Sequence, residues 1–141
     1  MIEPRRSLLV LILIALVWSV SAPAQVGEVF TASVTHVADG DTLTVTRTGD
    51  AVRIRLDGID TPETNQPFGR DATAFLSARV LHQHVTVTVK DVDRYGRFVS
   101  RVSVGGEDLS LALVAAGLAW HYVQYSDDAA LARAEADART N

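Results

Sequence analysis

The chain has 141 residues, of which 48% are hydrophobic and 21% are charged, a balance typical of globular proteins. It contains no cysteine, so packing must hold the fold without disulfides. The formal net charge is −4 and Lys90 is the only lysine, which argues against a broadly basic protein that binds polyanions nonspecifically. Any binding of phosphate must therefore rely on local groups of arginine.

The first segment of the chain has the order of a secretory signal peptide. Two arginines precede an unbroken apolar run at 8–18, and small residues lead up to Ala24. The alternative is a membrane anchor, but the apolar run is shorter than the roughly 20 residues that a spanning helix needs. We therefore predict a signal peptide at 1–24 and one secreted or periplasmic domain at 25–141.

The rest of the chain predicts a small barrel with helices. Alternating and β-branched residues indicate five strands, at 29–37, 42–46, 52–56, 85–89 and 98–104. Apolar residues at helical spacing in 67–81 predict an amphipathic helix between the third and fourth strands. A second helix is expected near 108–116 with Gly117 at its end, and a third after Ser126 as its N-cap. This order predicts a mainly β, α+β protein with a five-stranded OB-fold barrel and about three helices.

Two acidic segments carry candidate site residues. Asp39 and Asp41 flank a glycine between two predicted strands, and taken alone this is an ordinary hairpin turn, since Asp-Gly readily adopts positive φ. Asp60 and Glu63 flank Thr61 and a rigid proline just after a strand, where the alternative is a plain loop or the start of a helix.

Two arginine-bearing segments complete the set. Arg53 and Arg55 alternate on a predicted strand and project from one face, for which the alternative is a solvated surface. Segment 93–97 carries Arg97 at its end as a candidate site residue. The alternative interpretation is a polar hairpin turn. Carboxylates that hold a hard cation, a base and two guanidinium groups are together what hydrolysis of a phosphodiester needs.

The combination of motifs resembles the staphylococcal nuclease, or thermonuclease, family. The matching elements are DGDT at 39–42, DTPET at 60–64 with Arg55 five residues before it, DRYGR at 93–97 and ALVAAGLA at 112–119. The resemblance runs in the same order over nearly all of 25–141. It implies a metal-dependent endonuclease that cleaves DNA and RNA, leaves 3′-phosphate ends and acts as a monomer.

The resemblance also implies a metal site and a base. Asp41 and Asp60 would bind Ca²⁺ together with the Thr61 carbonyl, and Glu63 would activate the attacking water. The chemistry agrees, because Ca²⁺ prefers six to eight oxygen ligands and this set leaves positions for phosphate and water. A base in this place contributes about 10²–10⁴-fold to the rate.

For the substrate, the resemblance implies that Arg55 and Arg97 hold the phosphate, with Arg97 nearer the leaving 5′-oxygen. Planar guanidinium groups suit bidentate binding of phosphate oxygens. Arg94 stands where the family prototype has a lysine, which suggests a further phosphate contact. Tyr95 and Tyr125 are candidates for stacking on bases, with a role in the core or at the rim as the alternative.

Two other classes of protein stay open. One is a catalytically silent OB-fold module that binds single-stranded nucleic acid, although a pure binder has no use for a general base such as Glu63. The other is a noncatalytic Ca²⁺-binding exported protein, for which the paired arginines would be superfluous.

Overall fold

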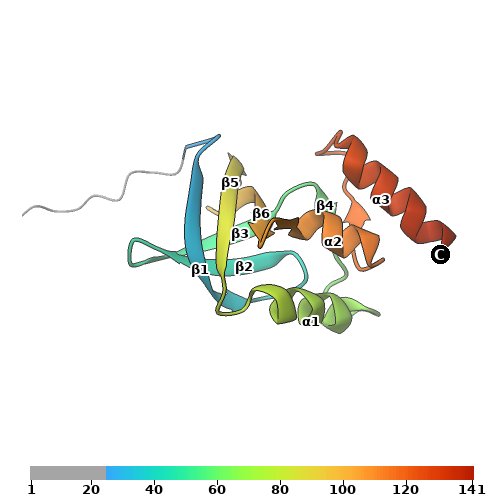
Figure 1. Cartoon of the computed structure of the whole chain (residues 1–141), viewed down its shortest axis with the longest axis horizontal. Helices are drawn as coiled ribbons and strands as arrows, with labels where there is room; N and C mark the ends of the chain where they lie inside the picture. Colours follow the sequence, from blue (N-terminus) through green and yellow to red (C-terminus); the bar gives the residue numbers. More distant parts are fainter. Residues whose placement is uncertain (1–24) are drawn as a thin grey trace, which may run out of the picture.

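The protein is described by a computed structural model over residues 25–141, so the predicted signal peptide lies outside the described residues. Its strands are β1 (Val29–Val37), β2 (Thr42–Arg47), β3 (Asp50–Leu56), β4 (Ile59–Asp60), β5 (His84–Val92), β6 (Phe98–Val104), β7 (Glu107–Asp108) and β8 (Trp120–His121). Its helices are α1 (Gly69–Val80), α2 (Leu109–Ala115) and α3 (Ala129–Thr140). Figure 1 shows the five long strands gathered at one end and α2 and α3 at the other.

The five long strands close into a barrel. Strands β1, β2 and β3 form an antiparallel meander, and β5 pairs with β1 on the other side. Strand β6 pairs antiparallel with β5 and parallel with β3, where Ile54 lies opposite Phe98 and Leu56 opposite Ser100. The parallel pairing joins the two ends of the sheet, which removes its open edges. The predicted five-stranded OB-fold is confirmed.

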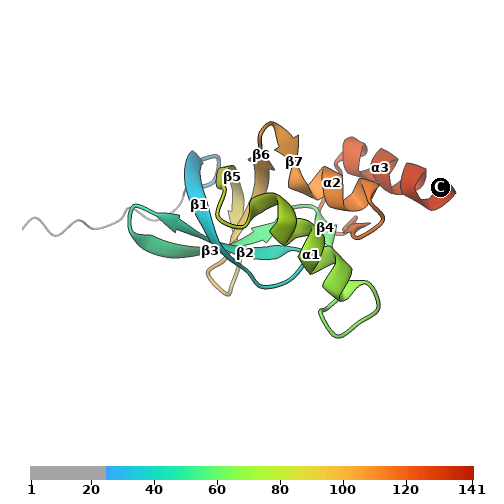
Figure 2. The same ribbon diagram turned by 60° about the horizontal axis from the view of Figure 1, so that its bottom comes forward.

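Helix α1 follows β4 and precedes β5, and Figure 2 shows it on the near side of the molecule, beside the barrel. Its buried face consists of Gly69, Ala72, Leu76 and Val80, which are spaced by three or four residues along the helix. The helix predicted for 67–81 is therefore confirmed, with its first turn beginning two residues later.

Helix α2 has a defined start and stop. The Asp108 side chain caps the start by accepting a hydrogen bond from the backbone N–H of Leu111. At the end, Gly117 adopts a φ of 74° while its N–H donates to the Val114 carbonyl and the Leu118 N–H donates to the Leu113 carbonyl. These two bonds form a Schellman motif, which confirms Gly117 as the stop signal.

The start of α3 differs from the prediction. The N-cap is Asp128, whose side chain accepts from the N–H groups of Ala130 and Leu131, so the expectation of Ser126 as the cap is wrong. The Ser126 hydroxyl is instead within 3.1 Å of His121 Nε2 and accepts from the Asp128 N–H. Ser126 thus fixes the turn before the helix, and this tertiary contact moves the helix start by two residues.

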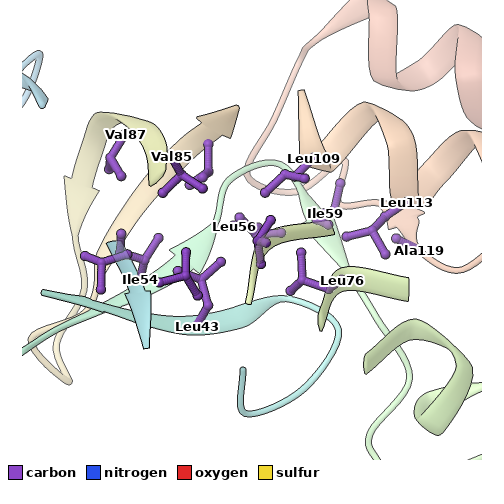
Figure 3. Packing of buried hydrophobic residues seen from close by; sticks show 14 of the residues in the cluster. Leu43, Ile54, Leu56, Ile59, Leu76, Val85, Val87, Leu109, Leu113 and Ala119 are labelled. Carbon is purple, nitrogen blue, oxygen red and sulfur yellow. The ribbon is translucent and has the colours of Figure 1, made fainter. Parts of the chain in front are cut away.

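One apolar core unites strands and helices. Figure 3 shows its central side chains, which include Leu43, Ile54, Leu56, Ile59, Leu76, Val85, Val87, Leu109, Leu113 and Ala119. Each fully buried leucine or isoleucine stabilises the fold by about 1.5–3 kcal/mol relative to an exposed one. Leu131 of α3 is also fully buried, so the last helix is anchored to the same core.

A two-stranded ribbon lies between the barrel and the helices. Strands β4 and β8 pair antiparallel, with Ile59 opposite His121 and Asp60 opposite Trp120. Ile59 and His121 are buried, so they form the inner face of the ribbon. Asp60 and Trp120 therefore share its outer face. Among residues 25–141, no helix combines the length and apolar character needed to cross a membrane.

Candidate active site

Asp41 lies in the connection between β1 and β2. The N–H groups of Ala38 and Asp39 donate to the Thr42 carbonyl, and the Asp41 N–H donates to Asp39 Oδ1 at 3.0 Å. The segment is therefore a hairpin connection, and it also holds the acidic residue Asp41 in place. Asp41 is only 6% exposed, which is unusual for an acidic residue in a turn.

The glycine of this turn has a different role from the one predicted. Gly40 does not have a positive φ, so the prediction of a left-handed Asp-Gly turn is wrong. A Cβ at Gly40 would come within 2.7 Å of the Ala72 Cβ and 2.9 Å of Thr61 Oγ1. Close packing against α1 and the loop after β4 therefore requires the glycine.

The carboxylate of Asp41 is tied to the segment after β4. Its Oδ2 accepts hydrogen bonds from both the N–H and the hydroxyl of Thr61, each at 3.0 Å, and its Oδ1 accepts from the Thr42 hydroxyl at 3.2 Å. Burial raises the pKa of Asp41 to about 6, although the neighbouring Arg55 and the Thr61 bonds oppose the shift. Asp41 is thus a carboxylate whose charge is incompletely compensated.

Arg55 on β3 bridges the two predicted metal-binding carboxylates. Its Nη2 lies 3.3 Å from Asp41 Oδ2 and 3.3 Å from Asp60 Oδ1, and its Nη1 donates to the Leu56 carbonyl at 2.8 Å. Its side chain is 15% exposed, so the alternative of a solvated arginine face does not hold at this position. Three segments that are separated in the sequence therefore meet at one guanidinium group.

The oxygen groups around Arg55 suit a hard cation. Asp41 and Asp60 supply carboxylates on either side of the same nitrogen, and Thr61 is bonded directly to Asp41. Within residues 25–141, no group of three or more His, Cys, Asp or Glu side chains gathers in a way that could hold a metal. A cation here would rely on two carboxylates, a backbone carbonyl and outside oxygens, a donor set that fits Ca²⁺ with open positions.

Glu63 lies in the exposed loop between β4 and α1, outside the bonds that join Asp41, Arg55 and Asp60. The loop itself is well defined. The Glu63 N–H donates to Gln66 Oε1 at 2.7 Å, and its carbonyl accepts from the Gln66 N–H at 2.8 Å. A Cβ at Gly69 would lie 1.9 Å from the Glu63 carbonyl oxygen, so only glycine allows the helix to start against this loop. Glu63 is therefore held in place through its backbone.

Arg97 is oriented by a residue that the motif analysis did not single out. Asp93 Oδ2 accepts from Arg97 Nε at 2.7 Å, while its Oδ1 accepts from the N–H groups of Tyr95 and Arg97. The Gly96 N–H donates to the Asp93 carbonyl, and Gly96 has a φ of 75°. Although burial opposes the shift, these hydrogen bonds lower the pKa of Asp93. The hairpin turn fixes Arg97 at the start of β6, the strand beside that of Arg55.

Tyr95 and Arg94 project from the same turn. The Tyr95 ring is exposed, and the guanidinium carbons of Arg94 and Arg97 lie 5.1 and 5.6 Å from its centroid. The structure therefore brings these three predicted site residues together, with two cations beside one aromatic face.

Tyr125 lies in a different neighbourhood. Its ring is exposed and meets Tyr122 edge-on, with centroids 4.8 Å apart. It borders a hollow of about 510 Å³ together with Lys90 and Arg101. Arg101 itself is paired with Asp108 and Asp128 at 2.9 and 2.8 Å. The structure thus places Tyr125 near Arg101, whose charge is neutralised by two aspartates, and apart from the carboxylates around Arg55.

These features define the class of the protein as an OB-fold barrel with a cluster of carboxylates and arginines built from β3, β4 and two connecting turns. Residues 53–141 match the family described as staphylococcal nuclease homologue. The match covers more than half of the chain, and the chain belongs to this family, as the motifs predicted.

Several relatives share this sequence pattern. An uncharacterized endonuclease of Escherichia coli O157:H7 is 42% identical over 107 residues, which cover 75% of this chain and 70% of that protein. A micrococcal nuclease of Shigella flexneri is 37% identical over 136 residues, covering 89% of this chain and 77% of the relative. Staphylococcal-like nuclease CAN1 of Arabidopsis thaliana is 42% identical over 87 residues, covering 62% of this chain and 27% of the plant protein.

Proposed function

We propose that this protein is a secreted, Ca²⁺-dependent endonuclease that hydrolyses phosphodiester bonds in DNA and RNA. The observation that carries the proposal is the position of Arg55 Nη2, 3.3 Å from a carboxylate oxygen of both Asp41 and Asp60. Asp41 in this cluster is costly for the fold, because burial penalises its charge. The membership in a nuclease family supports a catalytic reason for this cost.

Asp41, Asp60 and the Thr61 carbonyl would hold the cation in this proposal. Bound Ca²⁺ would neutralise charge on the phosphate and make the phosphorus atom more susceptible to attack by water. The raised pKa of Asp41 fits this role, because a buried carboxylate with uncompensated charge gains most from a cation. Thr61 fixes the direction of that carboxylate with its two hydrogen bonds.

Glu63 would act as the general base. In the reaction, one proton would move from water to the Glu63 carboxylate as the water oxygen forms a bond to phosphorus. The bond from phosphorus to the 5′-oxygen would break, and the leaving 5′-oxygen would take up a proton from a solvent water. The products are a 3′-phosphate end and a 5′-hydroxyl end. The backbone bonds to Gln66 and the close approach of Gly69 set the position of Glu63 relative to the acidic cluster.

Arg55 and Arg97 would bind the phosphate oxygens as negative charge develops on them. Both are pre-positioned, Arg55 by the Leu56 carbonyl and its two carboxylates and Arg97 by Asp93. Donors fixed before the reaction stabilise the transition state without paying for reorganisation. Arg94 and Tyr95 would extend the surface that binds the substrate. Tyr125 would be a more distant residue that stacks on a base.

The catalytic roles are tested by Glu63→Gln and Arg97→Ala. We expect each change to lower kcat at least roughly 10²-fold, because one removes the base and the other a donor to the transition state. Both side chains lie at or near the surface, so the melting temperature should change little. Arg133→Ala, at an exposed position on α3, is the matched control and should cleave like the parent. Nearly unchanged rates in folded variants would contradict the assignments.

The silent binding module remains the second candidate. It would bind single-stranded nucleic acid without Ca²⁺ and without cleaving it. Intact Glu63 and the carboxylate cluster speak against it, since neither helps a protein to bind a polyanion. Binding with no cleavage by the folded parent would decide in its favour.

Export and oligomeric state are part of the proposal. We expect the exported protein to begin at Gln25 and to behave as a monomer in the periplasm or the medium. N-terminal sequencing and the molar mass from light scattering check these points. An intact N-terminus on the exported protein, or a dimer mass, would contradict them.

A further inference from the structure

Two exposed aromatic rings border a cavity beside the acidic cluster. The cavity has a volume of about 350 Å³ and is lined mainly by apolar groups of Pro62, Phe68, Leu118 and Trp120. Phe68 is 67% exposed and Trp120 is 51% exposed, so neither ring serves the core. Neither residue has a part in the phosphate chemistry described above.

The strand register places Trp120 beside the proposed metal ligand Asp60. The two residues are direct partners in the β4–β8 pair, and both lie on the outer face of that ribbon. Direct partners in an antiparallel pair have Cβ atoms about 4.5–5.5 Å apart. Pro62, another wall of the cavity, follows two residues after Asp60 on the same loop. The cavity therefore lies next to Asp60 of the candidate active site.

The backbone at Phe68 is strained in a way that packing does not explain. Phe68 adopts φ 64° and ψ −1° at the N-cap of α1, a conformation that bulky side chains rarely take and glycine adopts freely. Its side chain is exposed, so the core gains nothing from the ring. Strain of this kind is often found where a side chain serves a ligand.

Charge around the cavity selects the type of ligand. Asp60, the strand partner of Trp120, disfavours an anionic group near the cavity, whereas flat neutral rings suit the aromatic walls. A second hollow of about 560 Å³ shares Gln66, Pro67 and Phe68 with the first and is also lined by Arg70 and Asp71, whose charges have opposite signs. A flat neutral ring therefore matches the aromatic cavity.

From these contacts we infer that Phe68 and Trp120 form a subsite for one unpaired nucleobase of the substrate strand. The inference rests on the proposed nuclease function and adds a substrate class to it, namely single-stranded nucleic acid. A base paired in a duplex cannot leave its stack to enter the cavity without a cost, whereas an unpaired base can stack on the indole directly.

The test separates the base from the phosphates of the same strand. The probes are a single-stranded oligonucleotide and an abasic strand of equal length and charge, measured with full-length protein. Trp18→Phe leaves Trp120 as the only tryptophan, and Glu63→Gln suppresses cleavage during titration. We expect the base-bearing strand to quench Trp120 fluorescence and to bind about tenfold more tightly than the abasic strand.

Kinetics of Trp120→Ala and Phe68→Ala provide the second arm. We expect KM for the single strand to rise about tenfold in each, with KM for the abasic strand unchanged and Trp120→Phe close to the parent. Val123→Ala, an exposed apolar residue outside the cavity lining, is the matched control. If Trp120→Ala fails to fold, Phe68→Ala carries the same comparison.

The outcomes distinguish the subsite from the nuclease function. Equal binding of both strands, or variants that cleave the single strand as the parent does, would overturn the subsite and leave the nuclease intact. A parent that cleaves nothing while the base-bearing strand still quenches Trp120 would overturn the nuclease function and keep the subsite.

Discussion

At the scale of single residues, Asp41 shows a conflict between stability and function. Its burial raises the pKa to about 6, so at neutral pH the folded protein holds an ionised carboxylate that lowers the stability of the fold relative to the unfolded chain. Thr61 and Arg55 reduce this cost but do not remove it. A site that is poorly compensated without its ligand is well prepared to bind a cation.

This conflict predicts a stabilising substitution. Asp41→Asn removes the charge and keeps an oxygen that can accept from Thr61, so without Ca²⁺ at pH 7 the free energy of unfolding should rise by about 1–3 kcal/mol. Urea unfolding in the presence of a chelator measures the difference.

The pH dependence provides the control for Asp41→Asn. The folded pKa lies above the unfolded value of 3.8, so the parent is stabilised at low pH and loses that contribution as the pH rises from about 4 to 6. The advantage of the Asn variant should therefore vanish near pH 4. A variant that is less stable than the parent at pH 7 would show that the Arg55 pair outweighs burial.

At the scale of elements, the loop between β4 and α1 depends on the start of the helix. The helix approaches so closely that a Cβ at Gly69 would collide with the Glu63 carbonyl oxygen. The loop therefore has its position set by α1, which in turn packs Ala72, Leu76 and Val80 into the core. The position of Glu63, the proposed general base, is thus linked to the packing of the barrel.

Gly69→Ala should therefore lower activity more than stability explains. We expect a loss of about 1–3 kcal/mol in the free energy of unfolding from overpacking, and a fall in kcat as Glu63 is displaced. Gly106→Ala is the control, because it adds strain at φ 83° with nothing within 4 Å and lies in the β6–β7 turn. Equal kcat for the two variants would show that Gly69 does not position the base.

The elements also show what sequence patterns can and cannot predict. The five long strands and α1 were predictable because each repeats its apolar residues over several turns or alternations. Strands β4 and β8 have two residues each, too few to show any period, and form only because the chain brings them together. The start of α3 was predicted wrongly at Ser126, because the Ser126 hydroxyl contacts His121 and Asp128 caps the helix instead.

The sequence named candidate site residues that the structure brings together, but it did not reveal their connections. The motifs named Asp41, Arg55 and Asp60, yet a sequence does not reveal that one guanidinium nitrogen contacts both acids. Asp93 had a local signal that was not used, because Asp at the first and Gly at the fourth position are typical of a type I turn. The tight packing of Gly40 and Gly69 had no signal in the sequence, since it depends on contacts with other segments.

At the scale of the whole molecule, the acidic balance limits how the substrate is held. The net charge is −4, and Arg101 is already paired with two aspartates, so it contributes little to binding a phosphate. Arg55, Arg94 and Arg97 remain as the main candidates for contacts with phosphate. The protein therefore binds its substrate through a small patch.

This predicts a modest dependence of KM on salt. About three phosphate contacts to a single strand correspond to a slope near 2 for log KM against log salt concentration, at roughly 0.7 per contact. Steady-state kinetics between low and physiological salt measure the slope. A slope near zero would mean that phosphates are not bound, and a slope of about 5 or more would require a far larger basic surface.

The most direct measurement is digestion of denatured DNA by the purified protein with Ca²⁺, with Mg²⁺ and with chelator, followed by analysis of the product ends. We predict cleavage with Ca²⁺, loss of cleavage with chelator, and products that carry 3′-phosphates and 5′-hydroxyls. Cleavage that persists in chelator would contradict the roles of Asp41 and Asp60. The absence of cleavage by the folded protein under all three conditions would contradict the nuclease function itself.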